Sequence, residues 1–157
     1  MVSDLGRRLV GLTDRFYDRV RDPAAQQAAH GEAASDFSAL RGAKYCVLVS
    51  YKRSGEAVPT PVWFGLDAQE RLYVRTAAGA AKVRRIRANP QVRVAPANAR
   101  GRPTGPPAEG TAHVLQSEEE QRAEAALRAN YGVGRTLYEG MSGPLGVDVV
   151  YLEVTPA

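Results

Sequence analysis

Residues 44–76, KYCVLVSYKRSGEAVPTPVWFGLDAQERLYVRT, predict three consecutive antiparallel strands. Apolar runs at 44–51, 57–66 and 71–76 are separated by two short polar turns. Gly55 ends the first turn, where it can adopt the positive φ that tight hairpins require. The stretch therefore indicates an antiparallel β meander.

Three more strands are predicted beyond this meander, at 91–96, 108–115 and 148–154. A short cationic helix at 79–88 and a second helix ending near Asn130 occupy intervening segments. Because six short strands with few helices do not form a βαβ series, the pattern favours a mainly β fold, a closed antiparallel β-barrel with added helices. The sequence also lacks the glycine-rich motifs of dinucleotide-binding and P-loop folds.

The N-terminal part of the chain has a different pattern. Apolar residues recur every three or four positions between Leu5 and Val20, which predicts an amphipathic helix over 3–20. The following segment is rich in alanine and weakly patterned. We therefore expect an N-terminal helical arm at residues 1–36 and a β-barrel domain at residues 37–157.

Charge is distributed unevenly along a chain whose net charge is +4. Residues 44–102 hold twelve basic and three acidic groups, whereas residues 103–157 hold three basic and eight acidic groups. A cationic block of this kind attracts an anionic ligand, and the alternative interpretation is an ordinary solvated basic face.

Composition excludes several classes of protein. No apolar run approaches the roughly 18 residues of a membrane-spanning helix. The single cysteine, Cys46, excludes an intramolecular disulfide and suits a reducing, cytoplasmic environment. With only His30 and His113, neither a Cys/His metal site nor a Ser-His-Asp triad is expected. If the protein is an enzyme, a cofactor must carry the chemistry, with Tyr131 and Tyr138 as candidate proton donors.

The strongest local signal for binding runs from Arg75 to Arg87. A strand ends at Thr76, a turn of small residues follows, and a helix begins near Gly79. Free N–H groups at the helix start, the helix dipole and Lys82 would together favour a phosphate. The alternative is a plain strand–helix junction with an exposed cationic face.

Two weaker signals accompany it. The segment Thr60-Pro61-Val62-Trp63 places a proline and a large aromatic on a strand that could present backbone groups to a planar ring, although the aromatic could equally be core. Further cations could reach an anionic tail, namely Arg84, Arg85 and Arg87 on the helix and Arg100 and Arg102 on a Gly/Pro-rich loop; for the loop, the alternative is an ordinary hairpin loop.

Taken together, the motifs PTPVWF, LYVRT, KVRRIRANP and AEGTA resemble the pyridoxamine 5′-phosphate oxidase-like split β-barrels. More narrowly, they are similar to the branch of that family that uses the deazaflavin coenzyme F420. The resemblance implies a six-stranded antiparallel split β-barrel of the FMN-binding type. It also implies a homodimer with two cofactor sites at the subunit interface.

The resemblance also implies roles for individual residues. The strand from Thr60 to Trp63 would line the ring system, and Thr76 and Lys82 would contact the phosphate, with Arg75 and Arg85 assisting. The implied cofactor-binding set is Thr60, Pro61, Val62, Trp63, Arg75, Thr76, Lys82 and Arg85. The chain departs from the family where Ala80 and Ala81 replace the Ser or Arg common in relatives, which disfavours a short single-phosphate cofactor such as FMN.

We therefore expect an F420-dependent oxidoreductase that transfers hydride between the deazaflavin and a small organic substrate. The alternatives are an FMN-binding split-barrel oxidase or reductase, and a non-catalytic binder of F420, haem or another planar ligand. Nucleic acid is not an expected partner, because the basic block lacks the stacking aromatics that single-strand readers use.

Overall fold

The computed structural model describes residues 21–131 and 148–157. The predicted helix at 3–20 and Tyr138 lie outside these described residues. No helix within them is both long enough and apolar enough to cross a membrane.

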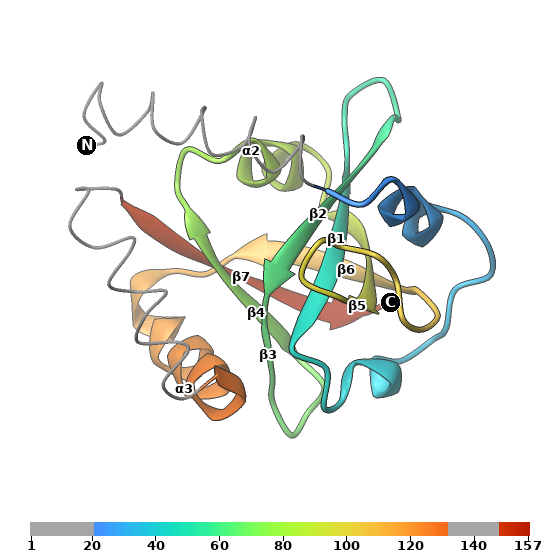
Figure 1. The fold of residues 1–157 in the computed structure, drawn as a ribbon. Helices are drawn as coiled ribbons and strands as arrows, with labels where there is room; N and C mark the ends of the chain where they lie inside the picture. Colours follow the sequence, from blue (N-terminus) through green and yellow to red (C-terminus); the bar gives the residue numbers. More distant parts are fainter. Residues whose placement is uncertain (1–20, 132–147) are drawn as a thin grey trace.

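The described residues form one curled antiparallel sheet with the strand order β2-β1-β5-β6-β7-β4-β3 (Figure 1). The prediction of a mainly β fold with an antiparallel sheet is confirmed, but the count of six strands is wrong, since the described part contains seven. The strands are β1 (Tyr45–Tyr51), β2 (Ala57–Trp63), β3 (Gly65–Leu66), β4 (Leu72–Ala77), β5 (Gln91–Ala97), β6 (Ala108–Val114) and β7 (Val149–Pro156).

The extra strand arises because the single strand predicted at 57–66 is interrupted at Phe64. Before the interruption β2 pairs with β1, and after it the two-residue β3 pairs with β4. The two edge strands of the sheet are therefore consecutive in the chain, and Phe64, only 1% exposed, fills the core between them. This single residue brings the two edges of the curled sheet together.

Alternation along the strands builds the core inside the curl. Val62, Phe64, Leu72, Val74 and their neighbours from the other strands form its main cluster. Cys46 is fully buried in the same cluster, and burial raises the pKa of its thiol far above the ordinary value. A thiol in this position packs as a small apolar group and is not a nucleophile.

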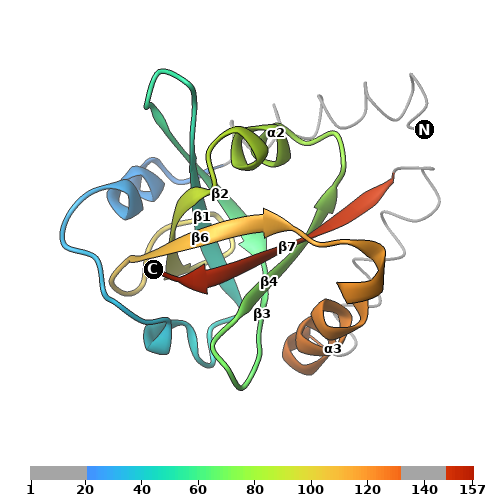
Figure 2. The ribbon, with the colours of Figure 1, turned by 180° about the vertical axis from the view of Figure 1, so that it is seen from behind.

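The helices lie toward opposite ends of the sheet, as both ribbon views show (Figure 1 and Figure 2). Helix α2 (Ala81–Ala88) starts two residues later than predicted, and α3 (Glu120–Tyr131) follows a 3₁₀ turn at Ser117–Glu119. Two more 3₁₀ turns, Pro23–Ala29 and Ser38–Leu40, precede the sheet.

The predicted arm has one described element that contacts the sheet. Ala25 and Ala28, in the 3₁₀ turn at Pro23–Ala29, are fully buried against Val47, Val49 and Ala95. This packing fixes the segment after residue 21 beside β1, β2 and β5.

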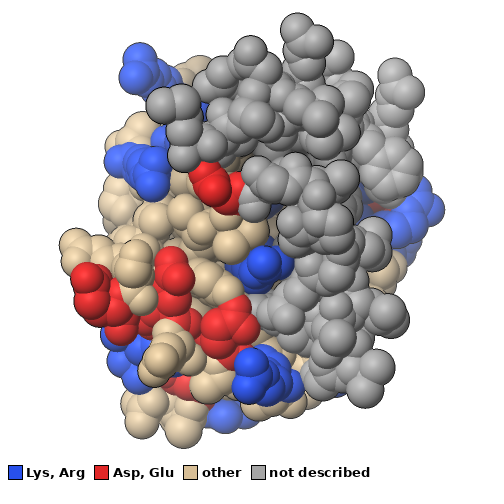
Figure 3. Space-filling view, turned by 90° about the vertical axis from the view of Figure 1, so that its left-hand side faces the viewer, with Lys and Arg blue, Asp and Glu red and all other residues tan. Residues whose placement is uncertain are grey.

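Acidic side chains form a group on the face of the molecule that carries α3. Figure 3 shows this group with basic side chains directly beside it. The start of α3 contributes acidic residues of the C-terminal third, with Glu118 and Glu119 in the 3₁₀ turn and Glu120 in the first turn of the helix. The cationic middle third supplies α2 instead, with Arg85 and Arg87 in its last turn.

Candidate functional site

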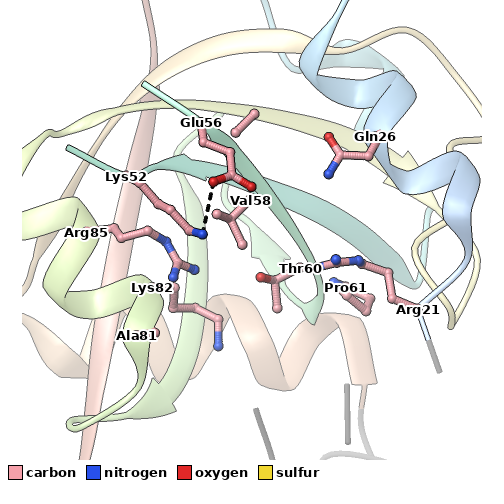
Figure 4. Close-up of a pocket in the computed structure, with 11 residues that line it drawn as sticks. Arg21, Gln26, Lys52, Glu56, Val58, Thr60, Pro61, Ala81, Lys82 and Arg85 are labelled. Atoms are coloured by element: carbon pink, nitrogen blue, oxygen red, sulfur yellow. Dashed lines mark ion pairs between the residues drawn. The ribbon is translucent and has the colours of Figure 1, made fainter. Parts of the chain in front are cut away.

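A cavity of about 230 Å³ lies between α2, the edge strand β2 and the turn that joins β1 to β2 (Figure 4). Its described lining carries four basic side chains and one acidic side chain. Apart from Gln26, small and apolar groups and Thr60 form the rest of the described wall. The residues that the following paragraphs use are Arg21, Lys52, Glu56, Val58, Thr60, Pro61, Ala81, Lys82 and Arg85.

Two of the cations come from α2, and buried hydroxyl groups hold them. Lys82 Nζ donates to Thr76 Oγ1 at 3.2 Å, and Arg85 Nε donates to Ser50 Oγ at 2.7 Å. Thr76 is 7% exposed and Ser50 is 1% exposed. Because a hydroxyl is neutral, these two contacts orient the cations without cancelling their charge.

The start of α2 has the features of the predicted phosphate cradle. Ala80 is the N-cap, in an extended conformation, and no described side chain caps the helix. Ala81, the first residue of α2, lines the cavity itself. Small side chains and helix-start N–H groups therefore stand beside Lys82, which is the arrangement that binds anions at helix N-termini.

The β1–β2 turn contributes an ion pair to the rim. Gly55 has a φ of 89°, which allows the tight turn that brings Lys52 and Glu56 together. Lys52 Nζ lies 3.0 Å from Glu56 Oε2, with the two side chains 52% and 63% exposed. An ion pair this exposed is weak and exchanges readily.

Strand β2 forms the opposite wall. Val58, Thr60 and Pro61 line the cavity from this strand, which is an edge of the sheet. Arg21 reaches the same edge, where its Nη1 donates to the Pro59 carbonyl at 2.5 Å. The edge position agrees with the two prolines, since an edge strand tolerates missing N–H donors.

Three predicted site residues lie elsewhere. Val62 is 8% exposed and belongs to the core cluster. Trp63 stacks on Tyr131 with ring centroids 4.6 Å apart and also contacts Tyr45 edge-on. Arg75 follows Val74 of the core, so it projects from the outer face of β4 and not toward Lys82.

The structure thus brings together five of the eight predicted residues. Four of them line the cavity, namely Thr60, Pro61, Lys82 and Arg85. The fifth, Thr76, accepts a hydrogen bond from Lys82. Sequence reasoning missed Arg21, Lys52, Glu56 and Ser50. A serine inside the apolar run 44–51 was the available signal for Ser50, because a buried hydroxyl needs a partner.

Of the cations that the sequence suggested for binding an anionic tail, some line the cavity and others do not. Arg84 folds back to donate to the Gly79 carbonyl at 2.7 Å. Arg87, Arg100 and Arg102 are not among the described residues that line the cavity. Arg85 is the helix cation that reaches it together with Lys82.

The candidate proton donors and metal ligands have other contacts. The Tyr131 hydroxyl accepts from the Phe64 N–H at 2.6 Å and donates to the Lys44 carbonyl, and burial raises its pKa. His113 Nε2 lies 3.3 Å from Glu153, away from the cavity lining. Among the described residues no group of three His, Cys, Asp or Glu side chains could hold a metal ion.

A family model described as pyridoxamine 5′-phosphate oxidase matches residues 32–157. No functionally curated protein matches the chain in sequence. The family match covers the whole described sheet, α2 and α3.

Solved structures share the curled sheet. A protein of unknown function from Agrobacterium tumefaciens aligns at a TM-score of 0.59 and 17% identity, covering 85% of this chain and 53% of that chain. The haem storage protein HutZ of Vibrio cholerae aligns at 0.56 and 15% identity, covering 74% and 84%. An FAD-binding protein from Mesorhizobium loti aligns at 0.53 and 17% identity, covering 75% and 82%.

These likenesses establish the fold and no more, because all three identities are low. The chain spans about half the length of the Agrobacterium protein, at 53% of it.

Proposed function

The chain belongs to the pyridoxamine 5′-phosphate oxidase family, and from this we propose that it binds coenzyme F420 and transfers hydride between that deazaflavin and a small organic substrate. The observation that carries the proposal is the cavity charge. Among the described residues, four basic side chains and one acidic side chain line it, and the acidic one, Glu56, is paired with Lys52. This excess of positive charge suits a ligand with more than one anionic group.

The residues present fit the anionic end of such a cofactor. Lys82 and the α2 start at Ala81 would hold the phosphate, with Thr76 orienting the Lys82 ammonium. Thr60 and Pro61 on β2 would border the ring system. When bound, the deazaflavin would supply the hydride chemistry.

The protein's own contribution is binding and orientation. The described cavity lining holds Lys, Arg, Glu and Gln side chains but no histidine, cysteine or tyrosine. No residue of this lining is therefore assigned a catalytic role, and the chain would act by positioning the cofactor against its substrate.

We propose in addition that two copies of the chain complete the site. The cavity of about 230 Å³ is smaller than the roughly 300–1,000 Å³ of small-molecule pockets. Its β2 wall is an edge strand of the sheet, and we expect a second chain to pack beside it. Sedimentation at micromolar concentration should give twice the chain mass, and a monomer that binds cofactor fully would contradict this arrangement.

The second candidate function is binding of FMN, FAD or haem. The family match suggests a flavin, and two of the structural relatives are described as a haem storage protein and an FAD-binding protein. Haem would need an axial ligand, and the described lining offers neither histidine nor cysteine. FMN would offer a single phosphate to a cavity whose described lining carries four cations.

The deciding experiment is equilibrium binding of F420, FMN and haem to the purified protein. We expect F420 to bind more tightly than FMN at low ionic strength, and the gap to narrow near about 0.5 M salt as screening shortens the Debye length. Equal or tighter binding of FMN at low salt would overturn the F420 assignment in favour of a flavin protein. Preferential haem binding would make the chain a haem binder.

A further inference from the structure

We infer that a proton on His113 fastens helix α3 to the sheet, through the buried carboxylate of Glu153 and the guanidinium of Arg122 on the helix. None of these three residues lines the cavity, so the inference is independent of the proposed function. It makes the docking of α3 sensitive to pH between about 5 and 8, the range in which histidine ordinarily changes its charge.

Glu153 lies at the centre of a row of side chains that crosses three strands. It stands on β7, and its cross-strand neighbours are His113 on β6 and Tyr73 on β4. The Glu153 side chain is only 6% exposed, and its Oε2 accepts from Arg122 Nε at 3.0 Å and from Arg122 Nη2 at 2.8 Å. His113 Nε2 lies 3.3 Å from Oε1. The carboxylate therefore has a charged partner on α3 and a titratable partner on the sheet.

Arg122 ties this row to α3 at the end where the helix begins to pack on the sheet. The next residue, Ala123, is fully buried in an apolar cluster that joins α3 to β4 and β7. At its other end the helix carries Asn130 and Tyr131, whose hydrogen bonds to Phe64 close the junction between β2 and β3. A stronger contact at the first end therefore holds both the helix and this junction in place.

The charges around Glu153 do not balance when His113 is neutral. Arg122 is shared between two carboxylates, because its Nη2 lies 2.8 Å from Glu119 as well as from Glu153. One cation thus faces two anions. The hydrogen bond from Arg122 is the main cause that lowers the pKa of Glu119, and the charge of His113 contributes to the same shift. A protonated imidazole supplies the second cation and balances the cluster.

The other groups around His113 keep their charge over this pH range. Tyr73 stays neutral because burial is the main cause that raises its pKa to about 12. Beyond Tyr73, Asp67 and Arg71 form an ion pair whose charges cancel. On the other side of β6, residues 90 and 91 carry no charge. Among the described groups of this cluster, His113 is therefore the one whose charge changes between about pH 5 and 8.

The test compares two variants of the full chain, which contains only two histidines. His113→Gln removes the titrating group at a position that is 52% exposed, so the variant should fold. His30→Gln is the matched control, because His30 is exposed and lies outside the cluster. Both variants are compared with wild type at about pH 5.5 and about pH 8, where histidine is mostly charged and mostly neutral, respectively.

Two measurements report on α3. Urea unfolding is followed by the fluorescence of Trp63, the single tryptophan, which stacks on Tyr131 at the end of the helix. The ratio of the unfolding constants of His113→Gln and wild type should be about two- to fivefold larger at about pH 5.5 than at about pH 8, the range expected for a half-exposed ion pair. At the lower pH, backbone amides of α3 should exchange faster in His113→Gln than in wild type by a similar factor. The control should match wild type in both measurements.

A third variant tests the charge balance. Glu119→Gln removes one of the two carboxylates that share Arg122 and leaves the buried Glu153 in place, so it should reduce the pH effect. An unchanged pH effect in this variant would contradict the imbalance.

Three results would overturn the inference. The first is a ratio of unfolding constants that is the same at both pH values. The second is a loss of the pH effect in His30→Gln as well as in His113→Gln. The third is equal exchange of the α3 amides in wild type and His113→Gln at the lower pH, which would show that the proton on His113 does not act on the helix.

Discussion

The two ends of β2 are built in opposite ways. At one end, Val58, Thr60 and Pro61 border the basic cavity along an edge of the sheet. At the other end, helix α3 covers the interruption at Phe64, whose N–H donates to the Tyr131 hydroxyl at 2.6 Å and whose carbonyl accepts from Asn130 Nδ2 at 2.7 Å. We refer to these as the cavity end and the sealed end.

The difference shows how one strand can serve both stability and binding. The sealed end joins the two edges of the sheet, so its buried backbone groups must be satisfied, and side chains 66 to 67 residues away in the chain satisfy them. The cavity end is bordered instead by long cationic side chains, which could contact a ligand. Substitutions at the sealed end should therefore affect stability, and those at the cavity end should affect binding.

The largest effect is expected for Gly65→Ala at the sealed end. An added Cβ would lie 2.3 Å from the Ala126 carbonyl carbon and 2.5 Å from the Leu127 nitrogen, which are both backbone atoms of α3. Relief requires the helix to move, and overpacking of this kind costs about 3 kcal/mol. For a chain of this size, that cost corresponds to a fall in Tm of about 6–12 °C, measured by circular dichroism.

Gly79→Ala is the matched control near the cavity end. An added Cβ at Gly79 meets no atom of the described residues within 4 Å, so the free energy of unfolding should change by less than about 0.5 kcal/mol. Equal losses of stability in the two variants would mean that α3 does not pack on the Gly65 backbone as described.

Lys82→Ala should produce the largest loss of binding at the cavity end. A charge-assisted contact with a phosphate contributes about 1.5–3 kcal/mol, so cofactor affinity should fall by about ten- to hundredfold with Tm nearly unchanged. Arg87→Ala is the control, because Arg87 is exposed on the same helix and does not line the cavity. If both variants retain wild-type affinity in titrations, the α2 cradle has no part in binding.

Local patterns in the sequence predicted the parts of the fold that depend on neighbours in the chain. Alternation and turn residues located the strands within residues 44–76 and the positive φ of Gly55. The predicted meander was wrong in its pairing, because β2 pairs with β1 and only the two-residue β3 pairs with β4. Helix α2 starts at Ala81, later than predicted, because Ala80 donates back to the Ala77 carbonyl and extends the turn. This turn and Lys82 were predicted to cradle a phosphate; Ala81 and Lys82 line the cavity, and the phosphate contact stays a prediction.

Long-range contacts explain what the sequence could not show. The strand predicted at 57–66 is interrupted at Phe64 because its first part pairs with β1 and its last two residues pair with β4. The apolar residues of this segment follow the pattern of a continuous strand, so the sequence does not reveal the interruption. Trp63 stacks on Tyr131, 68 positions away in the sequence, and its predicted place beside a cofactor ring stays a prediction. The Ser50–Arg85 contact likewise joins residues 35 apart, so no local motif indicates it.

Tyr131→Phe tests the sealed end more gently than Gly65→Ala. The variant keeps the ring stacked on Trp63 but removes the hydroxyl that accepts a hydrogen bond from the Phe64 N–H and donates one to the Lys44 carbonyl. Loss of these contacts should cost about 1.5 kcal/mol in urea denaturation, with cofactor affinity unchanged. A variant with full stability but reduced turnover would instead assign Tyr131 a role as a proton donor.

The smallest effect is expected at Asp67, in the turn between β3 and β4 beside the sealed end. Its carboxylate accepts from the backbone of Gln69 and Arg71 at 2.9 Å and from Arg71 Nε at 2.8 Å. Burial raises the pKa of Asp67, but the hydrogen bonds from Arg71 and Gln69 outweigh burial and hold the pKa below its ordinary value.

The direction of the pKa shift sets the direction of the pH dependence. A carboxyl group with a lowered pKa in the folded state stabilises the protein fully above its unfolded pKa of about 3.9, and this stabilisation is lost as pH falls through the folded pKa. Asp67→Asn should therefore lower the free energy of unfolding by at most about 1 kcal/mol at neutral pH. The difference from wild type should shrink below about pH 4, as measured by urea denaturation across the range. A difference that stays constant down to about pH 3 would show that the amide fails for steric reasons, and that the negative charge on Asp67 does not stabilise this turn.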